Sequence, residues 1–212
     1  MKKLNFYQSG RSMVEMLGVL AIIGVLSVGA IAGYSKAMMK YKLNKQAQQL
    51  SQLLNVLYRH KASWGTNPPP MNLISYLKKL GEIPKEMIKD ETVYIYDSFN
   101  GKIQMQTNGC TNNKCIDVIL RYTPAENNNI EICQNIFTVA KSFHQNLHSA
   151  GALKTTQDNP EYQNDNNTFY GDKYCTDTNC IRNMSLDDIY NKCQYMTDRS
   201  NGHYYFIFRP ND

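Results

Sequence analysis

GRSMVEMLGVLAIIGVLSVGAIAGY, residues 10–34, places one carboxylate, Glu15, near the start of an otherwise apolar helix that follows a short basic leader. Residues 16–35 carry no charged side chain, and at about 1.5 Å per residue they are long enough to cross the hydrocarbon core of a bilayer. A carboxylate that faces hydrocarbon costs about 3 kcal/mol even on lenient insertion scales. An anchor does not need Glu15, so we expect a partner group to neutralise it.

The leader differs from a secretory signal peptide, which places its small-residue cleavage site after the apolar stretch. Here the small pair Ser9-Gly10 comes before that stretch, and the first cysteine is Cys110, so there is no lipobox. A leader with Lys2 and Lys3, a break at Gly10 and a glutamate five residues later resembles the class III signal of type IV pilins and pseudopilins.

This resemblance implies that a prepilin peptidase cleaves after Gly10 on the cytoplasmic side and that the mature chain begins at Arg11. It also implies that Glu15 pairs with the terminal amine of a neighbouring subunit during assembly. Family members usually begin with Phe, Met, Leu or Val and are often N-methylated, so Arg11 departs from the pattern and its methylation stays open. Arg11 can also pair with Glu15 within one helix. The alternative is a single-span anchor that tolerates Glu15 near the membrane interface.

Length and charge limit the classes of protein that this chain can be. The 212 residues suffice for one membrane helix and one globular domain of about 150 residues. The net charge is +5, and +3 without Lys2 and Lys3, which is too weak and scattered to predict a nucleic-acid partner. Lysines flank both ends of the apolar segment, so the positive-inside rule does not decide the topology. All six cysteines follow residue 109, which predicts an oxidising compartment for the C-terminal part and a cytoplasmic N-terminus.

A second, amphipathic half is expected to continue the apolar helix without a break. Apolar residues recur at spacings of 4, 3, 4 and 3, with Gln49 outside their stripe, at Leu43, Ala47, Leu50, Leu54 and Leu57. No proline lies between residues 12 and 62, which predicts one long helix ending by Gly65, although two helices hinged near Gly33 are an alternative. Gly29 and Gly33 form a small-xxx-small pair that favours close helix packing. The domains predicted are a leader (1–10), a transmembrane and assembly half (11–35), an amphipathic half (36–62) and a globular head (63–212).

The head is expected to be α+β, with an antiparallel sheet of about four strands packed on the long helix. Patterns predict a short helix that Gly81 terminates, a tight turn at Asn100-Gly101 and a capping box at Ser185. The strands are expected at residues 92–96, 102–106, 115–122 and 203–208, helices at 72–80, 130–148 and after 185, and a long polar loop at 151–174. This order, with the run GEIPKEMI before the first strand, resembles the globular half of type IVb pilins.

Two cysteine segments have the same form, C-T-x-x-x-C-I, which predicts the local disulfides Cys110–Cys115 and Cys175–Cys180. That leaves Cys133 and Cys193 to pair, and the resemblance implies the same bond, although six cysteines allow fifteen connectivities. The alternative is a structural zinc site made by the four cysteines of the two repeated segments. His144 and His148 are spaced to share a helix face, but no third ligand has a recognisable spacing, so we expect no metal and no cofactor.

No nucleophile elbow, Walker loop, zinc-protease motif or glycine fingerprint occurs, so we do not expect an enzyme. The resemblance implies a filament subunit that forms a helical homo-oligomer, with the peptidase and an inner-membrane assembly platform as partners. It would reside in the inner membrane before assembly and in a periplasmic or extracellular filament afterwards. A minor pilin and a type II secretion pseudopilin are alternatives from the same superfamily. A single-span anchored periplasmic binding or sensor domain is the alternative from another class.

Overall fold

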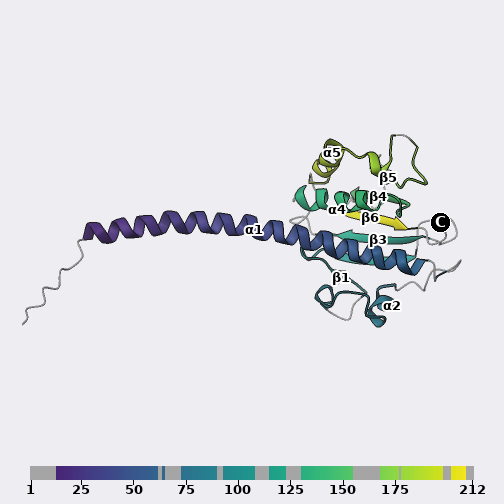
Figure 1. Cartoon of the computed structure of the whole chain (residues 1–212), viewed down its shortest axis with the longest axis horizontal. Helices are drawn as coiled ribbons and strands as arrows, with labels where there is room; N and C mark the ends of the chain where they lie inside the picture. The colour runs from purple at the N-terminus through teal and green to yellow at the C-terminus, as the bar shows by residue number, and fades with distance from the viewer. Residues whose placement is uncertain are drawn as a thin grey trace, which may run out of the picture. The chain divides into compact units, whose positions relative to one another are not determined.

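The computed structural model describes residues 13–61, 64, 73–89, 93–107, 115–122, 130–154, 168–176, 178–197 and 202–208. The chain divides into two compact units, Met1–Tyr41 and Lys42–Asp212. The predicted leader, with Gly10 and Arg11, lies outside the described residues. Figure 1 follows the chain from the first helix to the last strand.

Helix α1 runs without interruption from Met13 to Lys61, which confirms the predicted single long helix and is contrary to the alternative of two helices hinged near Gly33. Along its N-terminal half, the large apolar side chains that the structure describes are exposed. In the second unit five apolar side chains of α1 are each only 1% exposed, namely Leu50, Leu53, Leu54, Val56 and Leu57, whereas Leu43 and Ala47 of the predicted stripe are half-buried. The same helix therefore presents bare apolar surface at one end and core surface at the other.

Within the described residues the head contains one six-stranded antiparallel sheet in the order β1-β2-β3-β6-β4-β5. Its strands are β1 (Ile95–Tyr96), β2 (Lys102–Thr107), β3 (Ile116–Arg121), β4 (Ser149–Lys154), β5 (Thr168–Tyr170) and β6 (Gly202–Phe208). The expected number of about four strands is therefore wrong. The four strands predicted from the sequence occur as β1, β2, β3 and β6, and the two missed strands are β4 and β5.

Strand β4 was missed because its sequence, SAGALK, is rich in small residues with little intrinsic preference for strands. Its backbone pairs on both sides, with Ala150 opposite Phe206 of β6 and opposite Phe169 of β5. Pairing with the sheet therefore overrides the weak local signal. Residues 151–174 are correspondingly not one continuous loop, although 155–167 lie outside the described residues.

Helix α4 spans Ile130–Ser142, not 130–148 as the apolar periodicity predicted. The chain turns after Ser142 and enters the sheet, where the His148 amide donates to the Ile207 carbonyl. Gly171 packs directly on this turn, since a Cβ at that position would lie 1.8 Å from the Leu147 carbonyl oxygen. Pairing of the following residues with the sheet thus ends the helix. The apolar periodicity within the helix does not reveal this pairing.

The shorter helices follow their local signals closely. Helix α2 (Leu73–Lys79) ends before Gly81, whose φ of +70° is the left-handed conformation expected of a glycine C-cap. Helix α5 (Leu186–Thr197) begins with the predicted capping box, in which the Ser185 hydroxyl accepts from the Asp188 amide and the Asp188 carboxylate accepts from the Ser185 amide. Two 3₁₀ turns, η1 (Lys85–Met87) and η3 (Ile181–Asn183), complete the helical elements described.

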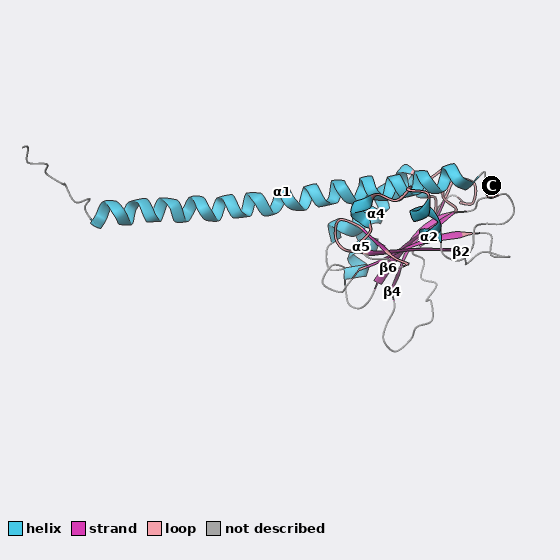
Figure 2. Ribbon diagram, turned by 90° about the horizontal axis from the view of Figure 1, so that it is seen from below, coloured by secondary structure: helices cyan, strands magenta, loops and turns pink. Residues whose placement is uncertain are grey.

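The core lies between the sheet and the helices that cover one of its faces. Figure 2 shows the distal turns of α1 and helix α4 on the same side of the strands. Phe137 of α4 packs edge-on against Tyr204 of β6, with ring centroids 6.4 Å apart, and against Phe169 of β5. Tyr204 is 1% exposed, so this aromatic contact forms part of the sealed interior.

A disulfide joins α4 to α5 through Cys133 and Cys193, with a Cα–Cα distance of 5.5 Å. Both cysteines are fully buried. A second disulfide, Cys175–Cys180, closes the short loop after β5, so these sulfur atoms are bonded to each other and are not zinc thiolates. Cys115 is also disulfide-bonded, whereas Cys110 lies outside the described residues.

We predict that the two bonds differ in their contribution to stability. Replacing Cys133 and Cys193 by alanine should lower the free energy of unfolding by about 4 kcal/mol, because the bond closes a long loop in the unfolded chain. Replacing Cys175 and Cys180 by alanine should lower it by about 2 kcal/mol. Denaturant titration of the full chain in detergent, followed by near-UV circular dichroism, measures both. Equal losses would contradict the loop-length explanation.

Candidate functional site

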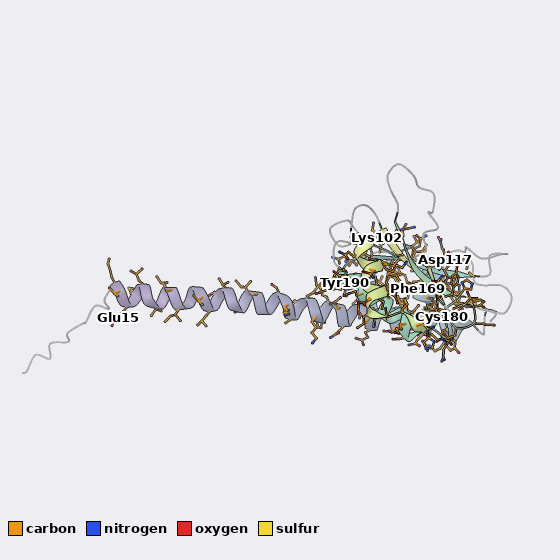
Figure 3. The ribbon with its side chains drawn as sticks, turned by 90° about the horizontal axis from the view of Figure 1, so that it is seen from above. Glu15, Lys102, Asp117, Phe169, Cys180 and Tyr190 are labelled. Carbon is orange, nitrogen blue, oxygen red and sulfur yellow. A yellow bond between two sulfur atoms is a disulfide. The ribbon has the colours of Figure 1, made fainter. Side chains whose placement is uncertain are left out.

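The residues that the sequence assigns to assembly lie on the N-terminal half of α1. Glu15 is exposed in the first helical turn (Figure 3). A Cβ added to Gly29 or Gly33 would meet no atom within 4 Å, so these glycines occupy open surface in the isolated chain. Gly10 and Arg11 lie outside the described residues, so the predicted cleavage site and the Arg11–Glu15 pairing stay predictions.

Around these residues the helix surface is apolar on every side. Twelve large apolar side chains are each at least 52% exposed, namely Met13, Val14, Met16, Leu17, Val19, Leu20, Ile22, Ile23, Val25, Leu26, Val28 and Ile31. Within the described residues, one helix is long and apolar enough to cross a membrane, and an 18-residue stretch of it has a mean hydropathy of 2.4. A helix that is apolar all round is typical of a membrane span or of a helix buried among others.

The two serine hydroxyls within this surface are satisfied by their own helix. Ser27 Oγ donates to the Ile23 carbonyl at 2.7 Å, and Ser35 Oγ donates to the Ile31 carbonyl at 3.0 Å. Each bond spans one helical turn and leaves no donor directed outward. Polar groups that are satisfied internally are compatible with a hydrocarbon environment, which supplies no hydrogen-bond partners.

Within the head, a cluster of buried polar side chains holds the amphipathic half of α1. This Asp97 cluster consists of Gln46, Asp97, Tyr122 and Asn135. Asp97 Oδ2 accepts from Gln46 Nε2 at 2.8 Å and from the Tyr122 hydroxyl at 2.5 Å. Asn135 Nδ2 donates to Gln46 Oε1 at 2.7 Å. The cluster therefore connects α1, the β1–β2 turn, the end of β3 and α4.

The β1–β2 turn is shaped around the same carboxylate. Asp97 Oδ1 accepts from the amides of Phe99 and Gly101, at 2.9 and 2.8 Å. Asn100 has a φ of 64°, and a Cβ at Gly101 would lie 2.2 Å from the Tyr122 ring, so both residues of the predicted Asn-Gly turn are required. The turn also meets α1 directly.

Two hydrogen bonds from Ser98 tie the turn to α1. The Ser98 amide donates to Gln49 Oε1 at 2.9 Å, and the Ser98 hydroxyl donates to the Lys42 carbonyl at 2.7 Å. Gln49 is only 4% exposed, so the expectation that it lies outside the buried stripe is wrong. One feature of the sequence could have indicated buried polar contacts on this helix. Gln46 is a polar residue placed three residues after Leu43 and four before Leu50, on the apolar face.

Burial dominates the electrostatics of this cluster. Asp97 is 4% exposed, and burial raises the pKa of its carboxyl, while the hydrogen bonds from Tyr122, Gln46 and the turn oppose that rise. Burial, followed by the neighbouring Asp97, raises the pKa of Tyr122 well above its usual value. The Tyr122 hydroxyl therefore keeps its proton and donates a hydrogen bond to Asp97. This arrangement holds elements together and offers no exposed reactive group.

Asp117, the second residue of β3, is another carboxyl whose pKa burial raises. Burial raises its pKa from 3.8 to about 6, although a hydrogen bond with Gln106 opposes the rise. Its Oδ1 atom is buried and has no hydrogen-bond partner. Asp117 is labelled in Figure 3. The ionised form of Asp117 therefore destabilises the folded head near neutral pH.

The head also has a polar hollow of about 410 Å³ between β5, η3 and α5. Its charged residues already have partners in the fold. Asp188 caps α5 through Ser185, and the Lys192 amine lies 5.8 Å from the centroid of the Phe169 ring. The hollow thus lacks a converging acid and base of the kind that a catalytic site requires.

The two histidines of the predicted metal alternative do not share a helix, because α4 ends at Ser142. His144 Nδ1 lies 2.8 Å from Asp172 Oδ2, and His148 Nδ1 lies 3.1 Å from Ser149 Oγ. Among the residues that the structure describes, no group of three or more His, Cys, Asp or Glu side chains is arranged to hold a metal ion.

We predict that Asp97 is a major determinant of stability. Asp97→Ala should lower the free energy of unfolding by roughly 3–5 kcal/mol, because it leaves two backbone amides, Gln46 and Tyr122 without their acceptor in a buried site. Asp97→Asn keeps one oxygen and should cost about 1–3 kcal/mol. Asp187→Asn, at an exposed position of α5, is the matched control and should change it by less than about 0.5 kcal/mol. Equal effects of Asp97→Asn and Asp187→Asn in denaturant titrations would contradict this role.

A pH-dependent effect is expected at Asp117. Its folded pKa lies above its unfolded pKa, so the folded state binds more protons between about pH 4 and 6 and loses stability as the pH rises through that window. Asp117→Asn should therefore stabilise the protein by about 1–2 kcal/mol at about pH 7, allowing for its partial exposure, and have little effect at about pH 4. Thermal unfolding at both pH values measures this. A gain independent of pH would show that charge is not the cause.

Comparison with known proteins identifies the fold. No protein-family model and no curated protein sequence matches the chain. Among solved structures it is similar to TcpA, a type IV pilin from the El Tor biotype of Vibrio cholerae, with a TM-score of 0.51 and 13% identity. The match covers 79% of this chain and 98% of that chain. At this identity the likeness is one of fold, and the chain accordingly has the type IV pilin fold, a long N-terminal helix followed by an α+β head with an antiparallel sheet.

Proposed function

We propose that this protein is a structural subunit of a type IV pilus-like filament, assembled through α1. The observation that carries the proposal is the bare apolar surface of the N-terminal half of α1 in a chain with a type IV pilin fold. An apolar surface of this size needs a cover, either lipid tails or the helices of other subunits. A filament subunit uses both in turn.

In this proposal the prepilin peptidase removes residues 1–10 in the inner membrane, where the N-terminus faces the cytoplasm. An assembly platform then transfers the subunit from lipid to the filament. Glu15 compensates the new terminal amine of a neighbouring subunit, which explains a carboxylate at the start of an apolar helix. The buried disulfide Cys133–Cys193 and the loop-closing disulfide Cys175–Cys180 suit a head that works outside the cytoplasm.

The order of head elements favours the type IVb branch within this proposal. A minor pilin or a type II secretion pseudopilin would use the same helix and the same processing. A membrane-anchored binding or sensor domain would retain residues 1–10 and would not depend on Glu15. Processing therefore separates the filament subunit from the anchored domain.

The first test is the intact mass and N-terminal sequence of the protein purified from its own membranes with a competent peptidase. We expect a chain that begins at Arg11, because the leader has the form that the peptidase cuts. Mass measured with and without reduction also counts the disulfides. A chain that begins at Met1 would refute the filament proposal and leave the anchored domain.

Assembly should depend on Glu15. Glu15→Ala leaves the neighbouring amine without its counter-charge in an apolar core, so we expect the yield of sheared filaments to fall at least about tenfold. The amount of subunit in the membrane should not change. Glu86→Ala, which removes an exposed carboxylate of the head, is the matched control. Equal filament yields for the two variants would contradict the assigned role of Glu15.

A further inference from the structure

The segment of α1 that follows the apolar half carries an uncompensated positive charge. Residues 36–45 contain four lysines, at 36, 40, 42 and 45. Residues 16–81 contain no aspartate or glutamate, so no lysine of this helix has the carboxylate three or four residues away that usually balances one. A carboxylate that pairs with these lysines would therefore have to come from outside this stretch of the chain.

Two of these lysines lie within the first unit and are exposed. Lys36 and Lys40 are exposed and one helical turn apart, so they share a face of α1. Among the described residues neither takes part in a salt bridge. Lys42, in the second unit, differs, since its amine lies over the Phe99 ring. Lys36 and Lys40 are therefore the available pair.

Their position along the helix matches a membrane interface. Lys36 directly follows the charge-free residues 16–35, which span about 30 Å, the thickness of the hydrocarbon core. Tyr34 is 67% exposed and Tyr41 is 58% exposed, and tyrosines are enriched at the level of lipid headgroups. Tyrosines and lysines thus occur together where the apolar span ends, as is typical of a membrane interface.

We infer that Lys36 and Lys40 bind the phosphate groups of anionic phospholipids in the leaflet opposite the leader, an inference that rests on the proposed membrane stage of the filament subunit. The lysine ammonium is a compact cation that donates hydrogen bonds to phosphate oxygens. Each basic side chain near an anionic surface strengthens association about fivefold.

Anionic lipid fits this site better than a second copy of the helix does. A parallel neighbour would present the same acid-free residues 16–81, so lysine would face lysine. The lipid contact also fixes the depth of the helix. With Lys36 at one interface, Glu15 lies about 30 Å away at the other and stays out of the hydrocarbon interior.

The test uses the full chain reconstituted in vesicles of phosphatidylcholine with phosphatidylglycerol. Spin-labelled forms of the two lipids report their relative association with the protein. We expect phosphatidylglycerol to be preferred several-fold, and the preference to vanish in Lys36→Gln/Lys40→Gln and to weaken strongly in about 0.5 M salt, where charges are screened within a few ångströms. Lys79→Gln/Lys85→Gln, which removes two exposed lysines of the head, is the matched control and should keep the preference.

Three results would overturn the inference. The first is no preference for phosphatidylglycerol in protein that resists alkaline extraction, which leaves the membrane stage intact. The second is an equal loss in both double variants, which indicates net charge instead of a site. The third is a zero-length crosslink from Lys36 or Lys40 to a carboxylate of a second copy, formed equally with and without phosphatidylglycerol. Protein that washes off the vesicles at alkaline pH would instead remove the membrane stage itself, and the inference with it.

Discussion

The head depends on one buried carboxylate. Asp97 accepts four hydrogen bonds, two from the turn that it starts and two from Gln46 and Tyr122. A buried carboxylate is costly unless it is fully hydrogen-bonded, so its donors have to arrive together. Because those donors belong to α1, the β1–β2 turn and the end of β3, formation of the cluster fixes three elements at once. Leucine packing alone would permit α1 to slide or rotate, whereas this set of bonds has one register.

In the rest of α1, buried hydrogen bonds play almost no part and apolar surface dominates. Its N-terminal half has almost no polar group to satisfy, and its two serines are satisfied within the helix. Such a surface is not selective, because lipid tails and apolar helices cover it equally well. Selectivity must therefore come from the charged residues at its ends, which are Glu15 on one side and the lysines that follow residue 35 on the other.

How much the sequence predicts depends on the range of the interaction. The continuity of α1, the Asn-Gly turn, the Gly81 cap and the Ser185 capping box are local, and the sequence predicted each of them. Strand β4 and the early end of α4 arise from pairing with β6, about 55 residues later, and no pattern within either segment reveals it. The Asp97 cluster was missed for a similar reason, since Gln46 reads as an ordinary polar helix residue until its partner, 51 residues away, is known. The assembly residues, by contrast, came from the sequence alone.

In the proposed transfer of a subunit from membrane to filament, these two halves of α1 have different effects. Burial of apolar helix surface against other subunits replaces contacts of similar strength with lipid, so it supplies little net drive. The charged ends do change environment. In our proposal Glu15 gains a neighbour's amine, whereas Lys36 and Lys40 give up lipid phosphates, and these changes oppose each other. The balance is then close enough for an assembly platform to decide the direction, while the Asp97 cluster keeps the head folded on its helix throughout.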